Sequence, residues 1–232
     1  MKIHESVIII TAASTPIGRA MALHFAQLGA SLALIDRDKQ ALNTIHQACL
    51  SIQPNCAAFV LNDEKKENGV IDIFNQIIHS FHRIDVLINT ASAEPFPPLF
   101  GKGSTDQFCH SLNKIGLNFF AFVKQAAEQM RAQEHAGVIL NLVLDREKNT
   151  QDSSLNPAMY YDGTKALISG LTHSWAEELA EFNIRVGGIV PLDIPIGASG
   201  RDKQQRQYDW VRNAEYIVCN DSFNGRLLES AL

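Results

Sequence analysis

The sequence predicts an α/β protein built as a single doubly wound parallel sheet with helices on both faces. Short apolar runs rich in β-branched residues alternate with longer stretches of helical periodicity along most of the 232 residues. The apolar runs are continuous, which is typical of strands buried on both faces of a parallel sheet. No linker, repeat or low-complexity tract interrupts the alternation, so we expect one domain over residues 1–232.

Strands are expected where short apolar runs are bounded by polar or turn-forming residues. The first run, residues 7–10, is too short for a buried helix. The later strands are expected over residues 32–35, 59–61, 86–88, 138–144 and 184–190, with a final one near 226–228. Parallel sheets of this kind bind ligands beyond the carboxyl ends of their strands, so functional residues are expected directly after these runs.

Helices are expected where apolar residues recur every three or four positions. In the first stretch, residues 17–28 show this spacing and Gly29 stands at the C-cap position. Further helices are expected over residues 41–49, 70–81, 105–133 and 157–181. The start of the last helix is indicated by two residues: Asn156 suits an N-cap, and Pro157 suits the first helical position. Beyond Pro191 the chain is too polar to assign from its pattern.

Composition narrows the class of protein. With 20 basic against 25 acidic side chains, the net charge of −5 predicts no nucleic-acid or anionic-membrane partner. No apolar run approaches the roughly 20 residues of a spanning helix, and the first residues do not resemble a signal peptide. The cysteines are scattered, at positions 49, 56, 109 and 219. We therefore expect a reduced, cytoplasmic protein without a membrane partner.

The segment after the first strand, Thr11 to Gly18, reads TAASTPIG. In a dinucleotide-binding loop, glycines allow a tight turn and a close approach to the pyrophosphate, which faces a helix N-terminus. Only Gly18 fits a three-glycine pattern here, since Ala12 and Pro16 fill the other places. A plain strand–helix turn explains this segment equally well.

Two further strand ends carry candidate ligand contacts. Asp36 follows the second strand, 18 residues beyond Gly18, where a carboxylate would bind an adenine ribose 2′-hydroxyl and repel a 2′-phosphate. Arg37 is adjacent and could do the opposite, and a solvated charged turn is the alternative. After the fourth strand, residues 89–92 read Asn-Thr-Ala-Ser, small enough either for close ligand approach or for a simple turn.

Tyr161 and Lys165 are four residues apart on an expected helix and share one face. A phenol has a reference pKa near 10, and a nearby ammonium lowers that pKa by favouring the phenolate. The pair is therefore a candidate general acid/base for carbonyl–alcohol chemistry. In isolation the spacing is common on ordinary helices.

Taken together, these features resemble the short-chain dehydrogenase/reductase family over nearly the whole chain. Residues 11–18 correspond to its Thr-Gly-x-x-x-Gly-x-Gly loop, residues 89–92 to Asn-Asn-Ala-Gly, and Tyr161 with Lys165 to Tyr-x-x-x-Lys. The resemblance implies a Rossmann fold, a bound NAD(H) or NADP(H), a small carbonyl or alcohol substrate, and a homodimer or homotetramer.

The resemblance also implies residue roles. Tyr161 would be the catalytic acid/base, and Lys165 would bind the nicotinamide ribose and lower the pKa of Tyr161. Asp36 would select NAD over NADP, Asp63 would lie near the adenine, and Asn89 would lie beneath the cofactor. The implied cofactor-binding residues are Thr11, Ser14, Thr15, Ile17, Gly18, Asp36, Asp63, Asn89, Lys165 and Ile194, the last through its backbone. No metal ligands are expected.

Departures from the family pattern keep a second hypothesis open. Val143 and Leu144 fill the positions of the catalytic serine, and Gly116 falls where a helix asparagine is expected. Ser153 or Ser154, in the segment before Tyr161, is a candidate replacement for the hydroxyl. Losing one donor at a developing oxyanion costs roughly 10²–10³ in rate. The sequence thus predicts a slow oxidoreductase or, as the alternative, a non-catalytic dinucleotide-binding or structural relative.

Overall fold

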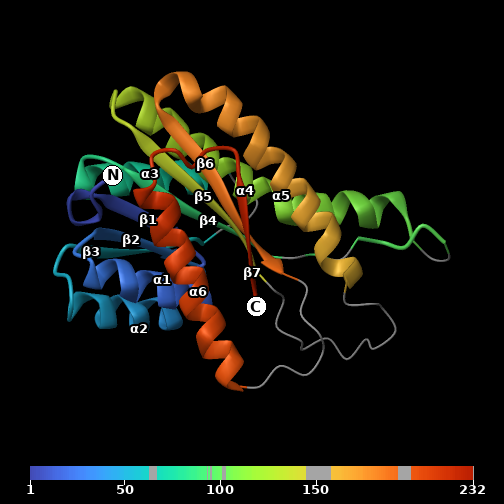
Figure 1. Cartoon of the computed structure of the whole chain (residues 1–232), viewed down its shortest axis with the longest axis horizontal. Helices are drawn as coiled ribbons and strands as arrows, with labels where there is room; N and C mark the ends of the chain where they lie inside the picture. The colour runs from blue at the N-terminus through green and yellow to red at the C-terminus, as the bar shows by residue number, and fades with distance from the viewer. Residues whose placement is uncertain are drawn as a thin grey trace.

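The computed structural model describes residues 1–62, 67–92, 94, 96–100, 103–144, 158–192 and 200–231, and confirms the predicted fold class (Figure 1). Seven parallel strands form one sheet in the order β3-β2-β1-β4-β5-β6-β7. The strands are β1 (Val7–Thr11), β2 (Ser31–Asp36), β3 (Cys56–Val60), β4 (Val86–Ser92), β5 (Gly137–Leu144), β6 (Ile184–Leu192) and β7 (Leu227–Ala231).

Helices connect successive strands and lie on both faces of the sheet (Figure 1). The described α-helices are α1 (Pro16–Gln27), α2 (Lys39–Leu50), α3 (Glu67–Phe81), α4 (Thr105–Ala132), α5 (Ala158–Leu179) and α6 (Gly200–Cys219). Short 3₁₀ helices cover Ile3–Glu5 and Ala180–Phe182. Within the described residues, no helix is long and apolar enough to cross a bilayer.

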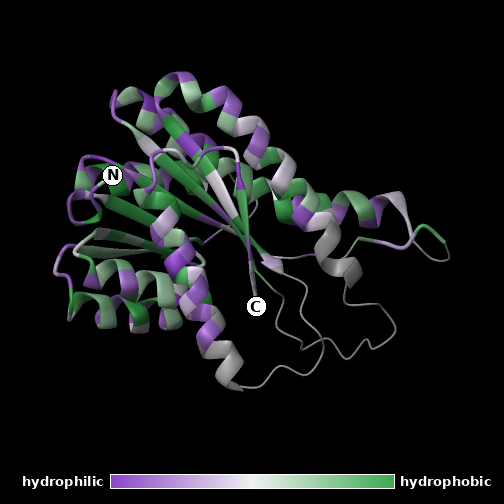
Figure 2. Cartoon of the chain, viewed as in Figure 1, coloured by the Kyte–Doolittle hydropathy of each residue, from purple (hydrophilic) through white to green (hydrophobic). Residues whose placement is uncertain are grey.

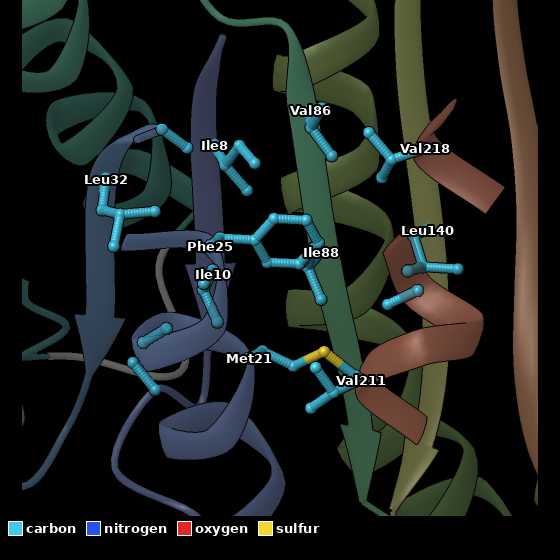
Figure 3. Close-up of a cluster of buried hydrophobic side chains, with 14 of the residues drawn as sticks. Ile8, Ile10, Met21, Phe25, Leu32, Val86, Ile88, Leu140, Val211 and Val218 are labelled. Carbon is cyan, nitrogen blue, oxygen red and sulfur yellow. The ribbon is translucent and has the colours of Figure 1, made fainter. Parts of the chain in front are cut away.

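Alternate residues of each strand supply two separate cores. Even-numbered residues of β1, β4 and β5 pack against α1, α2 and α6, and odd-numbered residues pack against α3, α4 and α5. Figure 3 shows the first core, in which Met21 and Phe25 of α1 and Val211 of α6 surround Ile10 and Ile88 of the sheet. This two-faced burial explains why the strands are apolar along their length while the helices are apolar on one side (Figure 2).

Helix α6 was not predicted, because its polar composition hides a narrow apolar stripe. The stripe consists of Trp210, Val211, Ala214, Ile217 and Val218, all buried in the core shared with α1. Trp210 is fully buried and belongs to this core.

One other expectation needs correction. Residues 89–92 continue β4 and do not form a turn, because they pair in register with residues 141–144 of β5. On α4, Phe120 is 52% exposed, although its ring contacts the buried Trp175 with centroids 6.3 Å apart. The predicted cap residues Asn156 and Pro157 lie outside the described residues.

Candidate functional site

The candidate site lies at the carboxyl edge of the sheet, where the strand order changes direction between β1 and β4. At this point Thr11 joins the two strands. Its Oγ1 accepts a hydrogen bond from the Thr90 N–H at 2.9 Å, and its carbonyl accepts one from Thr90 Oγ1 at 3.2 Å. Thr11 is buried, so these bonds hold the carboxyl ends of β1 and β4 together.

The loop between β1 and α1 turns tightly although it lacks two of the three family glycines. Ala12 takes the left-handed conformation, with φ of 50°, which a glycine would adopt at less cost. Thr15 is the N-cap of α1: its Oγ1 accepts from the Gly18 N–H at 3.1 Å and donates to the Ala12 carbonyl at 2.7 Å. Pro16 stands at the first helical position, which suits its fixed φ.

Gly18 is required for a steric reason. A Cβ at this position would lie 2.2 Å from the Ala12 carbonyl oxygen, so the start of α1 could not approach the end of β1 so closely. The sequence pattern had marked Gly18 only as a weak dinucleotide signal. The structure gives it a defined role in the helix–strand contact.

Replacing Gly18 by alanine is expected to lower the free energy of unfolding by about 1–3 kcal/mol, the usual cost of overpacking. The matched control is Gly170→Ala, because Gly170 is an exposed glycine within α5 and a Cβ there meets nothing within 4 Å. That control should raise the stability by about 0.5–1 kcal/mol. Urea unfolding of both variants measures the difference, and equal midpoints would contradict the steric role of Gly18.

Most amides of this loop are already hydrogen-bonded within the protein. The bonded N–H groups are those of Ala13 to the Ile35 carbonyl, Ser14 to Asp36, Thr15 to the Ala12 carbonyl, and Gly18 to Thr15 Oγ1. Pro16 has no N–H. Among residues 13–18, which the structure describes throughout, the Ile17 N–H in the first turn of α1 therefore remains free to donate to an anion.

Asp36 ends β2 and ties that strand to the loop. Its Oδ2 accepts from the backbone N–H of Ser14 at 2.8 Å and from Ser14 Oγ at 2.7 Å. Its Oδ1 accepts from the Arg37 N–H at 2.7 Å and, at 3.4 Å, from the Asp38 N–H. A carboxylate offers about four lone-pair sites, so a ribose hydroxyl bound here would replace one of these donors.

Asn89 and Asn141 are paired in register on β4 and β5 and are both fully buried. The Asn89 Nδ2 donates to the Phe119 carbonyl of α4 at 2.9 Å, and the Asn141 Nδ2 donates to Thr172 Oγ1 of α5 at 2.8 Å. Within the described part of the chain, neither Oδ1 has a partner. The structure thus directs the Asn89 amide toward α4.

The positions of the family serine are apolar and packed. Val143 is buried on the α4–α5 face of the sheet, and Leu144 is 8% exposed and joins the core beside α1 and α6. The in-register neighbour of Leu144 on β4 is Ser92. Leu144 therefore places a methyl-rich side chain where the family pattern has a hydroxyl.

Helix α5 carries Tyr161 and Lys165 one turn apart. The Lys165 Nζ donates to the Glu229 Oε1 of β7 at 2.8 Å. Sequence reasoning missed Glu229, because it is 64 residues from Lys165 and no local pattern connects a residue of β7 with α5. The side chain of Tyr161, and the residues Asp63, Ser153, Ser154 and Ile194, lie outside what the structure describes.

In the part of the chain that the structure describes, no group of three or more histidine, cysteine, aspartate or glutamate side chains could hold a metal ion.

A parallel sheet with a glycine-bearing loop at its switch point defines a dinucleotide-binding type of fold. Residues 6–206 match the short chain dehydrogenase family, and the chain belongs to that family. It is therefore a member of a family of oxidoreductases, as the sequence resemblance implied.

Individual relatives agree with this assignment. An uncharacterized oxidoreductase of Staphylococcus epidermidis is 29% identical over 209 residues, which cover 89% of this chain and 86% of that protein. The 3-oxoacyl-[acyl-carrier-protein] reductase of Thermotoga maritima is 27% identical over 192 residues, covering 82% of this chain and 75% of the reductase. The crystal structure of an NAD⁺-bound xylitol dehydrogenase has the same fold, with a TM-score of 0.78, 22% identity and full coverage of both chains.

Proposed function

We propose that this protein is a nicotinamide-dependent oxidoreductase that acts on a small carbonyl or alcohol, with Tyr161 as the proton donor or acceptor. The observation that carries the proposal is that α5 presents Tyr161 and Lys165 one turn apart, in a chain of the short chain dehydrogenase family. The NAD⁺-bound xylitol dehydrogenase of the same fold supports a nicotinamide cofactor.

The residues that follow β1 and β2 at the carboxyl edge of the sheet fit a dinucleotide. The free Ile17 N–H at the N-terminus of α1 can donate to a pyrophosphate. Gly18 allows the start of α1 to lie close to the end of β1, which suits the same ligand. Asp36 favours the ribose 2′-hydroxyl of NAD over the 2′-phosphate of NADP, because two anionic groups would repel each other. Thr11, Ser14, Thr15, Asn89 and Lys165 complete the proposed cofactor site, together with Asp63 and Ile194.

The chain's own contribution to the reaction is proton transfer and charge stabilisation. A nicotinamide held by the proposed cofactor-binding residues would supply or accept the hydride. Tyr161 donates a proton to the substrate oxygen during reduction and takes it back during oxidation. The Lys165 ammonium favours the phenolate and so lowers the pKa of Tyr161 toward the working pH. With Leu144 at the serine position, the substrate oxygen has one donor fewer, so a slow enzyme is expected.

A non-catalytic dinucleotide-binding or structural relative is the second candidate. It is favoured by Leu144, which removes the serine hydroxyl, and by the saturated Asp36 carboxylate. In either case we propose one cytoplasmic domain over residues 1–232 that forms a homodimer or homotetramer through α4 and α5. The exposed Leu117 and Phe120 on α4 support a covered helix face.

The two candidates are separated by assaying oxidation and reduction of a panel of small alcohols, ketones and aldehydes with NAD(H) and NADP(H). The expected result is slow turnover with a preference for NAD(H). Calorimetry with the same cofactors, without substrate, is the second arm. Micromolar binding without turnover would favour the non-catalytic binder, and the absence of both would leave a structural role.

A further inference from the structure

We propose that Glu229 is a positioning residue for Lys165 and competes with the nicotinamide ribose for its ammonium group. The inference rests on the proposed function, because it assigns Lys165 to the cofactor. It adds a residue of the last strand, β7, to a site otherwise built from the loop after β1, from β4 and from α5.

The register of the sheet places Glu229 under α5. Strand β7 runs parallel to β6, and Glu229 pairs with Val190. Val190 is buried in the core on the α4–α5 side of the sheet. Neighbouring residues on paired strands project to the same face, so the Glu229 side chain projects toward α5 as well. The pairing of β7 with β6 therefore places Glu229 where its side chain can contact Lys165.

The ion pair is short and partly shielded. The Nζ–Oε1 distance is 2.8 Å, and the side chains of Lys165 and Glu229 are 27% and 53% exposed. The residue before Lys165, Thr164, is fully buried and contacts the backbone of Glu94 through its Oγ1. The backbone at this point of α5 is thereby fixed, which limits how far Lys165 can shift without changing its rotamer.

Within the described side chains, Glu229 is the carboxylate bonded to the Lys165 ammonium, and the other charges of the adjoining elements are placed differently. From the segment after β4, the Glu94 carboxylate is paired with Lys114 of α4 at 3.3 Å. On α5 itself, Tyr161 and Asp162 precede Lys165 by four and three residues, and the side chains of both lie outside what the structure describes. Glu229 from β7 is the carboxylate bonded to the Lys165 ammonium. This anion therefore reduces the field that Lys165 would exert on a bound ribose.

Two consequences follow for the properties of the protein. A nicotinamide ribose that binds Lys165 must displace or share the Glu229 carboxylate, so the carboxylate weakens binding of the dinucleotide. Partly exposed ion pairs are weak, so the effect on Kd should be about two- to fivefold. The same negative charge would also oppose the action of the Lys165 ammonium on the proposed acid/base, Tyr161.

The test compares Glu229→Gln with the unaltered protein in titrations with NADH and with ADP, followed by NADH fluorescence and by calorimetry. The Glu229→Gln variant should bind NADH about two- to fivefold more tightly and ADP equally well, since ADP lacks the nicotinamide ribose. Glu178→Gln is the matched control, because it makes the same charge change at an exposed position near the end of α5. It should change neither affinity.

A second arm asks whether the effect acts through Lys165. In a Lys165→Met background, Glu229→Gln should leave the NADH affinity unchanged, which is the sign of direct coupling in a double-mutant cycle. In alcohol oxidation, the rising limb of kcat/KM should move about half a pH unit lower in Glu229→Gln, because the base form of Tyr161 is then more easily reached. Glu229→Asp keeps the charge, so the rising limb of its kcat/KM profile should lie at the same pH as in the unaltered protein.

The outcomes separate this inference from the proposed function. Equal or weaker NADH binding by Glu229→Gln, with binding to the unaltered protein intact, overturns the role of Glu229 alone. A gain shared by ADP also overturns it, since the effect would then be a general charge effect. If neither protein binds NADH, the inference falls together with the proposed function.

Discussion

Replacing Tyr161 by phenylalanine is expected to lower kcat/KM by roughly 10²–10⁴-fold, the usual contribution of a positioned general acid or base. The substitution removes a single hydroxyl from α5 and leaves the phenyl ring. Steady-state kinetics of a substrate found in the screen, measured with NADH, gives the result. The NADH affinity and the thermal unfolding midpoint should stay close to those of the unaltered protein.

Tyr208→Phe is the control for this experiment. It removes the same hydroxyl group from a residue that is 59% exposed on α6, outside the candidate site. It should retain full turnover. Turnover by Tyr161→Phe within about threefold of the unaltered protein would remove Tyr161 from the proton-transfer step, because general acid/base groups contribute at least roughly 10². The family assignment would stand, and the non-catalytic candidate would gain support.

Introducing a hydroxyl at position 144, where the family pattern has a serine, should raise the turnover number. Leu144→Ser is expected to raise kcat by roughly 10²–10³-fold, since one donor aimed at a developing oxyanion accounts for a change of this size. Leu144 ends β5 at the carboxyl edge of the sheet, where the family pattern places the serine. The measurement is the ratio of kcat values for the same substrate and cofactor.

The same substitution removes buried apolar atoms and will cost stability. Leu144 is 8% exposed and packs in the core with α1 and α6, so a loss of about 2–5 kcal/mol is expected, as for other truncations of buried leucine. Leu144→Ala leaves a similar cavity without a hydroxyl, and it should lose stability without gaining activity. Equal activities of the serine and alanine variants would show that a hydroxyl at this position does not reach the substrate oxygen.

The sheet was predictable because most of its strands are continuous apolar runs that can be recognised from the local sequence. The apolar runs that became β1, β2 and β5 are buried on both faces, so each carries its signal without reference to the rest of the chain. Helix α6 was missed for the opposite reason. Its buried stripe is narrow, and a polar N-terminal half masks the spacing of Trp210, Ala214 and Ile217.

The local placement of candidate residues was predictable where one segment fixes it, while their roles in a site stay predictions. Gly18 and the pair of Tyr161 and Lys165 are of this kind, since a turn or a helix fixes their neighbours. Glu229 was not predictable, because the pairing of β7 with β6 brings it under α5 from a distant part of the chain. The hydrogen bonds between Asp36 and Ser14 likewise arise only when two strands and a loop meet.

The bonds that Asp36 makes to Ser14 have a consequence for attempts to redesign the protein. In the proposed cofactor site, exchanging this aspartate for a small or basic residue is the route to binding a 2′-phosphate. Here the exchange would also release the backbone of Ser14, and with it the turn that sets the start of α1. A successful redesign must therefore supply a new anchor for residue 14 before it alters the carboxylate.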